Sequence, residues 1–207
     1  MARQVDYYFS LASPWAYIGH PLFISIARQH DCTINYKPVF LGELFAETGG
    51  LPLNKRHPAR QRYRMLELQR WREKRGLSFH LQPQNWPFNA RLADGVVLAA
   101  MAGGHDPEPY VKAVYPAVWE RQFNLGDAAV IAGLADEAGL PGAKLVEQAG
   151  SDAITGAYEK NRDEAIAAGV FGSPAYVLDG EVFWGQDRLE LLADALASKR
   201  KPYQSSV

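Results

Sequence analysis

The sequence contains a single cysteine, Cys32, among 207 residues. One cysteine cannot form an internal disulfide or build a cysteine-rich zinc site. It also leaves no pair of thiols for dithiol–disulfide exchange. This cysteine usage favours a reducing compartment. Any thiol chemistry of this protein therefore has to come from a bound cofactor.

Long apolar runs and an excess of one charge are also absent. No stretch approaches the roughly 18 apolar residues of a membrane helix, and the first residues lack the apolar core of a secretory signal. The 22 basic and 23 acidic side chains leave a net charge of −1, which gives no sign of nucleic acid or an anionic membrane as partner. The sequence predicts a cytoplasmic protein with no nucleic-acid or membrane partner.

What remains is the composition of a globular chain. It is 47% hydrophobic and 22% charged, which excludes disordered, coiled-coil and collagen-like classes. A chain of this length buries about 70% of its unfolded surface, so it needs no disulfide or metal to stabilise its core. The length predicts one domain with a sizeable insertion.

The first forty residues follow a strand–helix–strand pattern. Residues 4–9 and 32–40 alternate as strands, and Ser13 followed by Pro14 marks the start of a helix between them. Serine caps a helix, and proline suits the first turn because its missing N–H would be unpaired there anyway. Pro21 is expected to bend this helix or restart it. A strand–helix–strand unit predicts parallel pairing of its two strands.

Helical periodicity dominates the middle of the chain, from about residue 57 to 168, before strand patterns return. Residues 175–178 and 182–184, joined by Asp-Gly, predict a β-hairpin. A closing helix over 187–198 follows, and the tail from residue 199 is expected to fray.

Neither pair of strands makes a stable sheet alone, so the two ends of the chain are expected to form one sheet. We therefore predict an α/β domain made of residues 1–50 and 169–207. Residues 51–168 form a helical insertion in it.

Ser13 is the most informative candidate for chemistry, because it lies where a strand passes into a helix. A helix N-terminus offers unpaired N–H groups and a partial positive charge, which stabilise an anion such as a thiolate. The serine hydroxyl can donate one further hydrogen bond. Ser173 and Pro174 precede a returning strand, where proline often follows a cis peptide. From spacing alone, an ordinary helix cap at Ser13 and an ordinary strand start at Pro174 are the favoured interpretations.

Four segments together resemble a known family. Ser13-Pro14-Trp15-Ala16 looks like the Cys-Pro-x-Cys motif of thioredoxin-like disulfide oxidoreductases, with serine and alanine in place of the cysteines. The order of elements resembles the DsbA-type branch of that fold, and the motifs match kappa-class glutathione transferases and 2-hydroxychromene-2-carboxylate isomerases. The resemblance implies a thioredoxin-like fold with an all-helical insertion. The matching segments are residues 6–17, Trp119 with residues 121–123, residues 169–174 and residues 183–189.

The resemblance implies roles for individual residues. Ser13 matches the catalytic serine that hydrogen-bonds the sulfur of glutathione, and Ser173 with cis-Pro174 matches the segment whose backbone binds the cysteinyl part. Asp187 matches the segment that holds the γ-glutamyl group, since an aspartate pairs with an α-ammonium. Without the resemblance, Asp187 is equally explained as a helix cap. The neighbours of Asp187 in this segment are Gln186, where the family usually carries Asn or Ser, and Arg188.

The family also uses a polar residue in the loop after the second strand. Asn54 is our candidate, with Lys55 as a neighbouring anion contact, and a plain surface loop is the alternative. The stretch over residues 55–75 is strongly basic and includes Tyr63 and Trp71, as a nucleic-acid site would require. A solvated helix face is favoured, with one or two arginines turned toward an anionic substrate, because the rest of the chain is not basic.

Other chemistry-bearing residues give weaker signals. The five histidines are scattered and show no metal-ligand spacing, so no metal site is predicted. Cys32 is expected to act as a small, at least half-buried hydrophobe. The tryptophans at 15, 86, 119 and 184 are expected in the core or in a pocket wall.

The resemblance implies a glutathione-dependent isomerase similar to 2-hydroxychromene-2-carboxylate isomerase, acting in bacterial aromatic degradation. It further implies glutathione as cofactor, a small aromatic carboxylate as substrate and a homodimer. The mechanism it implies is thiolate addition, which turns a double bond into a single bond. Ring opening and rotation about that bond follow, and elimination returns the thiol and gives a trans-benzylidenepyruvate-type product. Two alternatives stay open. One is a kappa-like glutathione transferase that releases a conjugate, and the other is a DsbA-like protein that binds thiols or peptides without catalysis.

Overall fold

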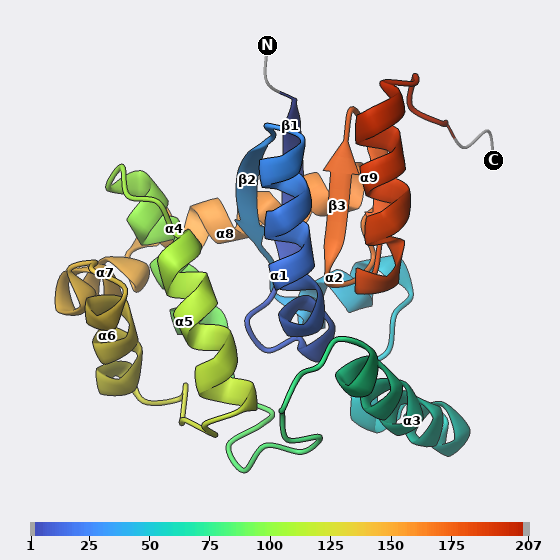
Figure 1. The fold of residues 1–207 in the computed structure, drawn as a ribbon. Coiled ribbons are helices and arrows are strands. Elements are labelled where there is room, and N and C mark those ends of the chain that lie inside the picture. The colour runs from blue at the N-terminus through green and yellow to red at the C-terminus, as the bar shows by residue number, and fades with distance from the viewer. Residues whose placement is uncertain (1–2, 205–207) are drawn as a thin grey trace.

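The computed structural model describes residues 3–204, and its strands form one mixed sheet in the order β2-β1-β3-β4 (Figure 1). β1 is parallel to β2, with Tyr7 opposite Tyr36, and antiparallel to β3, with Tyr7 opposite Tyr176. This topology confirms the predicted parallel pair and the union of both chain ends in one sheet. The strands are β1 (Gln4–Phe9), β2 (Thr33–Pro38), β3 (Ala175–Leu178) and β4 (Glu181–Trp184).

Helices cover both faces of the sheet. Tyr7 and Phe9 of β1 pack in the large core with α1 and α9, whereas Tyr8 points to the other face, where Leu44 of α2 and Ala165 of α8 cover it. This alternation follows from the two-residue period of a strand. The helical elements are α1 (Pro14–Gln29), α2 (Leu41–Thr48), η1 (Leu53–Lys55), α3 (Pro58–Lys74), α4 (Arg91–Ala102), α5 (Glu108–Trp119), α6 (Ala128–Glu137), α7 (Gly142–Ala149), α8 (Asp152–Ala167), η2 (Gln186–Arg188) and α9 (Leu189–Ser198).

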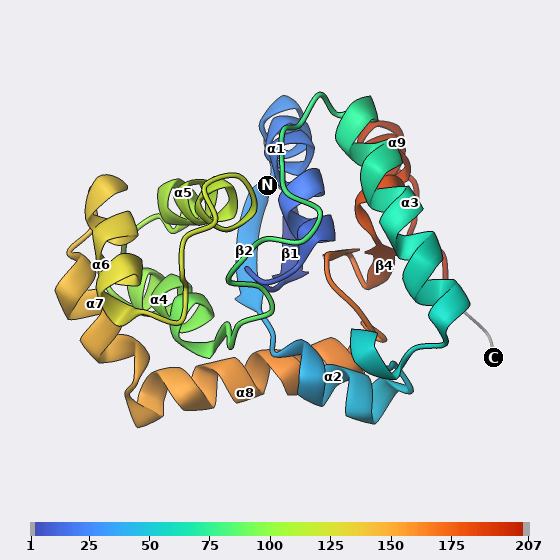
Figure 2. The ribbon, with the colours of Figure 1, turned by 90° about the horizontal axis from the view of Figure 1, so that it is seen from below.

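The helices between β2 and β3 lie on different sides of the sheet. Figure 2 shows α4 to α7 clustered on one side of the sheet and α3 on the opposite side, with α8 running along between that cluster and α2. α3 contacts α1, and Figure 1 places it near the end where α1 begins. Across residues 3–204, no helix is both long and apolar enough to cross a membrane.

Three local expectations need correction. α1 runs unbroken through Pro21, which lies on its exposed side, so the helix does not restart there, and the bend at Pro21 stays a prediction. β2 ends at Pro38, two residues early, because the chain turns there into α2. The closing helix α9 begins at Leu189 and not at Asp187, which lies in the preceding 3-10 turn η2.

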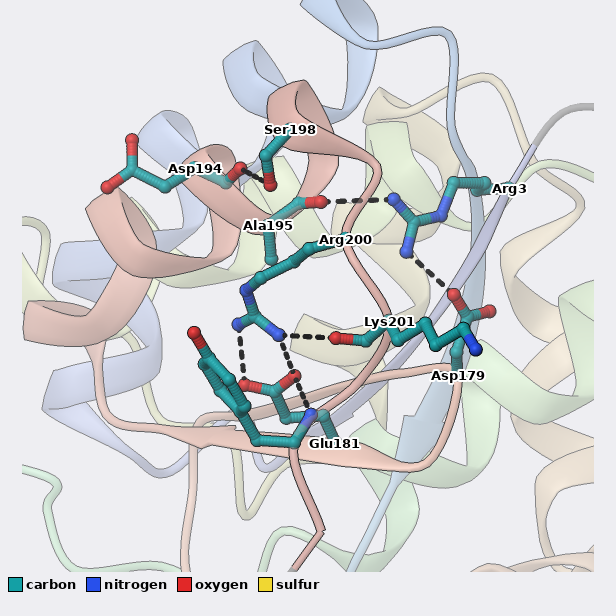
Figure 3. A network of polar contacts seen from close by, with 9 residues as sticks. Arg3, Asp179, Glu181, Asp194, Ala195, Ser198, Arg200 and Lys201 are labelled. Carbon is teal, nitrogen blue, oxygen red and sulfur yellow. Dashed lines mark hydrogen bonds and ion pairs between the residues drawn. The ribbon is translucent and has the colours of Figure 1, made fainter.

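Polar contacts hold the tail from Arg200 to Tyr203 (Figure 3), contrary to the expectation that it frays. Arg200 donates to both carboxylate oxygens of Glu181, at 2.7 and 2.8 Å, and the Tyr203 amide donates to the same group at 2.9 Å. Arg3 lies beside this network and pairs with Asp179 at 2.6 Å. The serine-rich end, residues 205–207, lies outside the described residues.

Candidate active site

Ser13 caps α1, as predicted. Its Oγ accepts a hydrogen bond from the Ala16 amide at 3.3 Å, and Pro14 occupies the first turn. The same hydroxyl donates to the backbone carbonyl of Ser173 at 3.2 Å. Ser13 is buried, so this proton has few other acceptors. The helix start is therefore joined to a segment 160 residues away along the chain.

The segment that Ser13 reaches carries the predicted cis peptide, between Ser173 and Pro174. The Oγ of Ser173 accepts from the Ser10 amide at 3.1 Å. The Ser173 amide itself has no hydrogen-bond acceptor within residues 3–204. Ser173 thus presents a free N–H and a carbonyl with a spare lone pair, the two groups that pair a second extended chain.

A cavity of about 470 Å³ opens beside this junction. Ser173, Gln186, Asp187 and Arg188 line it, so the structure brings these predicted residues together. Ser13 and Pro174 are buried next to Ser173 and are not themselves lining residues. The other walls come from the aromatic residues Trp15, Tyr63, Trp71 and Trp184 and from the charged residues Arg56, Arg60, Arg64 and Glu67.

Asn54 and Lys55 lie on η1, both exposed, and they are not among the residues that line this cavity. Their contact with a ligand stays a prediction. Trp86 and Trp119 also lie outside the lining. Trp119 is part of the core, and the Trp86 indole donates to the Ala12 carbonyl at 2.9 Å.

The segment after β4 approaches α1 very closely. A Cβ on Gly19 would lie 2.7 Å from the Cβ of Gln186, so only glycine allows this contact. Gln186 is buried and accepts from Arg75 Nη2 at 3.4 Å. Asp187 and Arg188 remain exposed to the cavity and pair with each other at 2.5 Å. Close packing thus fixes Gln186 and leaves its two charged neighbours free to exchange partners with a ligand.

The cavity carries more unpaired positive than negative charge. Its acids, Glu67 and Asp187, each pair with an arginine, at 2.5 Å in both cases. Arg64 has no carboxylate within 4 Å among the described residues, and its guanidinium lies 5.3 Å from the Trp86 ring. Burial, with a smaller effect of Arg56, lowers the pKa of Arg64 to about 10. A half-buried guanidinium without a counter-ion is a site that favours an anion.

The basic stretch over residues 55–75 predicts that one or two of its arginines face an anionic substrate, but not which ones. The structure puts Arg56, Arg60 and Arg64 in the cavity wall. The spacing of Arg60, Arg64, Glu67 and Trp71 by three or four residues was the signal for one helix face. Sequence reasoning also missed Asp94, a buried acid beneath residues 10–13, although an acid inside the apolar run of α4 marks it.

Comparison with known proteins identifies the family. The DSBA-like thioredoxin domain model matches residues 4–197. The chain belongs to this DsbA-like family. A 2-hydroxychromene-2-carboxylate isomerase of Sphingobium xenophagum is 31% identical over 95% of this chain and 99% of its own. Glutathione S-transferase kappa 1 of Caenorhabditis elegans is 24% identical over 93% and 90%.

A solved structure of a 2-hydroxychromene-2-carboxylate isomerase superposes with a TM-score of 0.80 at 27% identity, covering 95% of both chains. A probable DsbA oxidoreductase of Streptomyces coelicolor, at 18% identity and a TM-score of 0.77, shares the fold. The predicted thioredoxin-like fold of DsbA type, with its helical insertion, is confirmed.

Within residues 3–204, this DsbA-like protein has no cysteine thiol at the start of α1. Cys32 lies just before β2, half-buried as expected, and burial raises the pKa of its thiol. His20 lies on the buried face of α1, where burial lowers its pKa to about 3 and keeps it neutral. No cluster of histidine, cysteine and acidic side chains in residues 3–204 could hold a metal ion.

Proposed function

We propose that this protein binds glutathione and uses its thiolate to isomerise a 2-hydroxychromene-2-carboxylate-type compound to the trans-benzylidenepyruvate. One observation carries the proposal: the Ser13 hydroxyl caps α1 and reaches the Ser173 backbone at the edge of a cationic cavity, where residues 3–204 place no cysteine thiol. The similarity to named isomerases over nearly the whole chain supports it. The proposal includes a homodimer, by resemblance, and a cytoplasmic location, because the low cysteine usage favours a reducing compartment.

The groups around the junction fit a tripeptide with a central thiol. The free amide and the carbonyl of Ser173 would pair the cysteinyl backbone. Asp187 would bind the α-ammonium of the γ-glutamyl group, with Arg188 and the segment of Gln186 and cis-Pro174 around it.

The glycyl carboxylate needs a cation at the other end of the tripeptide. In the loop after the second strand, the resemblance offers Asn54 as a polar contact and Lys55 as a neighbouring anion contact. Arg56 follows Lys55 directly, Arg60 lies in the first turn of α3, and both line the cavity. We assign the carboxylate to this cationic end of α3, because a planar guanidinium binds a carboxylate through two hydrogen bonds.

When bound, glutathione supplies a thiolate that adds reversibly to the conjugated substrate. Ser13 stabilises that anion. In the structure its hydroxyl donates to the Ser173 carbonyl, and rotation of the hydroxyl would turn the same proton toward a ligand sulfur at the start of α1. The unpaired N–H groups and partial positive charge at the start of α1 act in the same direction. Both effects lower the pKa of the bound thiol, and each pKa unit is equivalent to about 1.4 kcal/mol.

Arg64 favours an acidic second substrate. The two carboxylates of glutathione find partners at Arg188 and at the pair Arg56 and Arg60, which leaves the half-buried Arg64 guanidinium without a counter-ion. A substrate carboxylate supplies one, and the flat walls of Trp15 and Trp184 suit a planar bicyclic ring. This charge balance favours an isomerase of aromatic carboxylates over a transferase, whose electrophiles need no charge.

The test offers the protein glutathione together with a panel of chromene carboxylates and, separately, chlorodinitrobenzene. We expect isomerised carboxylate that depends on glutathione and contains no sulfur. Conjugates as the only product would assign the protein to the kappa-like transferases. Binding of glutathione without turnover of either substrate would identify a non-catalytic thiol- or peptide-binding protein.

A further inference from the structure

Asp94 is a fully buried carboxyl that the proposed chemistry does not use. It lies on α4, in the helical segment between β2 and β3. Its Oδ1 accepts from the Leu11 amide at 3.0 Å, and its Oδ2 accepts from the Ser10 hydroxyl at 3.2 Å and the Tyr158 hydroxyl at 2.8 Å. One side chain of α4 therefore receives two hydrogen bonds from the segment between β1 and α1.

The hydrogen bond from Ser10 connects Asp94 to the thiol site, by which we mean the junction of Ser13 and Ser173. The Ser10 amide donates to Ser173 Oγ at 3.1 Å, and the Ser10 carbonyl accepts from the Ser13 amide at 3.0 Å. Ser13 closes the circuit by donating to the Ser173 carbonyl at 3.2 Å. Ser10 thus contacts Asp94 on one side and both Ser13 and Ser173 on the other.

Hydrogen bonds, and not a counter-ion, hold this carboxyl. Within the described chain, no lysine, arginine or histidine lies within 4 Å of it. Besides Tyr158 of α8, the polar groups nearby are the hydroxyls of Tyr110 and Tyr115 on α5 and the guanidinium of Arg91. Tyr110 donates to the Ala93 carbonyl at 3.2 Å, and Arg91 lies over the Tyr158 ring and pairs with Glu43. Burial raises the pKa of Asp94 to about 7. Burial disfavours the ionised form of this carboxyl, and its three hydrogen bonds offset that cost only in part, so packing alone does not account for it.

We propose that Asp94 is a positioning residue: it fixes the segment from Ser10 to Ser13 against the cis-proline loop, so that the Ser13 hydroxyl and the Ser173 backbone face the same sulfur. This inference rests on the proposed function. It predicts that Asp94 acts on the ionisation of bound glutathione through Ser10, without touching the ligand.

Three variants test this role. Asp94→Leu leaves the Leu11 amide and the Ser10 hydroxyl without an acceptor. Asp94→Asn restores both contacts, because its oxygen accepts from the amide and its NH₂ can donate to the Ser10 hydroxyl. Tyr158→Phe is the matched control, because it removes a hydrogen bond to the same carboxyl on the side away from the thiol site.

Two readouts apply to each variant: the pKa of bound glutathione, from thiolate ultraviolet absorbance against pH, and hydrogen exchange of the Ser10 and Ser13 amides without ligand. In Asp94→Leu we expect a raised thiol pKa, faster exchange and a loss in kcat/KM of about 100-fold, the size expected for a small misplacement. Asp94→Asn and Tyr158→Phe should stay close to wild type in thiol pKa and exchange.

An unchanged thiol pKa in Asp94→Leu, or faster exchange confined to α4 and α8, would overturn the proposal. If Asp94→Leu does not fold, Ser10→Ala removes the hydroxyl link with the same expectation. If wild type binds no glutathione, the proposed function fails, and the exchange of the Ser10 and Ser13 amides still decides the role of Asp94.

Discussion

Replacing Asp94 with asparagine changes how the stability of the protein depends on pH. Burial raises the pKa of this carboxyl from 3.8 to about 7, and the hydrogen bonds from Leu11, Tyr158 and Ser10 only partly oppose that rise. Between these two values the folded state keeps a proton that the unfolded chain has released, so rising pH destabilises the fold through this residue. The full rise is equivalent to about 4 kcal/mol.

Asparagine carries no charge at any pH, so the variant lacks the contribution of Asp94 to the pH dependence of stability. The contributions of the other titrating groups are the same in both proteins and cancel when the two are compared. Urea unfolding of both proteins, followed by circular dichroism, measures the difference. Relative to wild type, we expect the free energy of unfolding of Asp94→Asn to rise by about 3 kcal/mol between about pH 5 and about pH 8. Equal pH dependence in the two proteins would refute a buried carboxyl that titrates near neutrality.

Three further predictions concern the site and the tail. Ser13→Ala should lower the free energy of unfolding, measured in urea, by about 1 kcal/mol through loss of the helix cap. It should also raise the thiol pKa of bound glutathione, measured by thiolate absorbance, by about 1 to 2 units. An unchanged thiol pKa would contradict the proposed role of Ser13. Arg64→Gln should raise KM for a chromene carboxylate by about 10- to 100-fold and leave glutathione affinity unchanged. The control Arg62→Gln, on the exposed side of α3, should alter neither. Equal effects of the two changes in steady-state kinetics would argue against a carboxylate site. Glu181→Gln should release the tail, because it removes the carboxylate that pairs with Arg200. Trypsin should then cut after Arg200 faster than in wild type. An unchanged cleavage rate would show that the ion pair does not hold the tail.

Local sequence signals were enough for the frame of the site. Alternation marked β1, the Ser13-Pro14 pair marked the start of α1, and Asp-Gly marked the hairpin between β3 and β4. Each of these signals acts within a few residues, so the sequence contains it directly. The position of Ser13 next to cis-Pro174 needed the resemblance, because 160 residues separate Ser13 from Ser173.

The remaining features depend on partners distant in the chain. α3 carries charges on nearly all sides and buries only Leu68, so its periodicity does not reveal that Arg64 faces the cavity. Asp94 meets Ser10 and Tyr158 from 84 and 64 residues away, and no local pattern brings them together. The tail looked free because the pairing of Arg200 with Glu181 exists only once α9 has packed beside β4.

The central claim is that glutathione places an ionised sulfur at the start of α1. Calorimetric titration with glutathione, paired with thiolate absorbance of the complex against pH, tests it most directly. The matched ligand is the same tripeptide with alanine in place of cysteine, which keeps both carboxylates and the ammonium. The account predicts that both tripeptides bind the wild-type protein and that the bound thiol ionises well below its free pKa of about 8.5. Absence of binding, or a bound thiol that ionises like free glutathione, would contradict it.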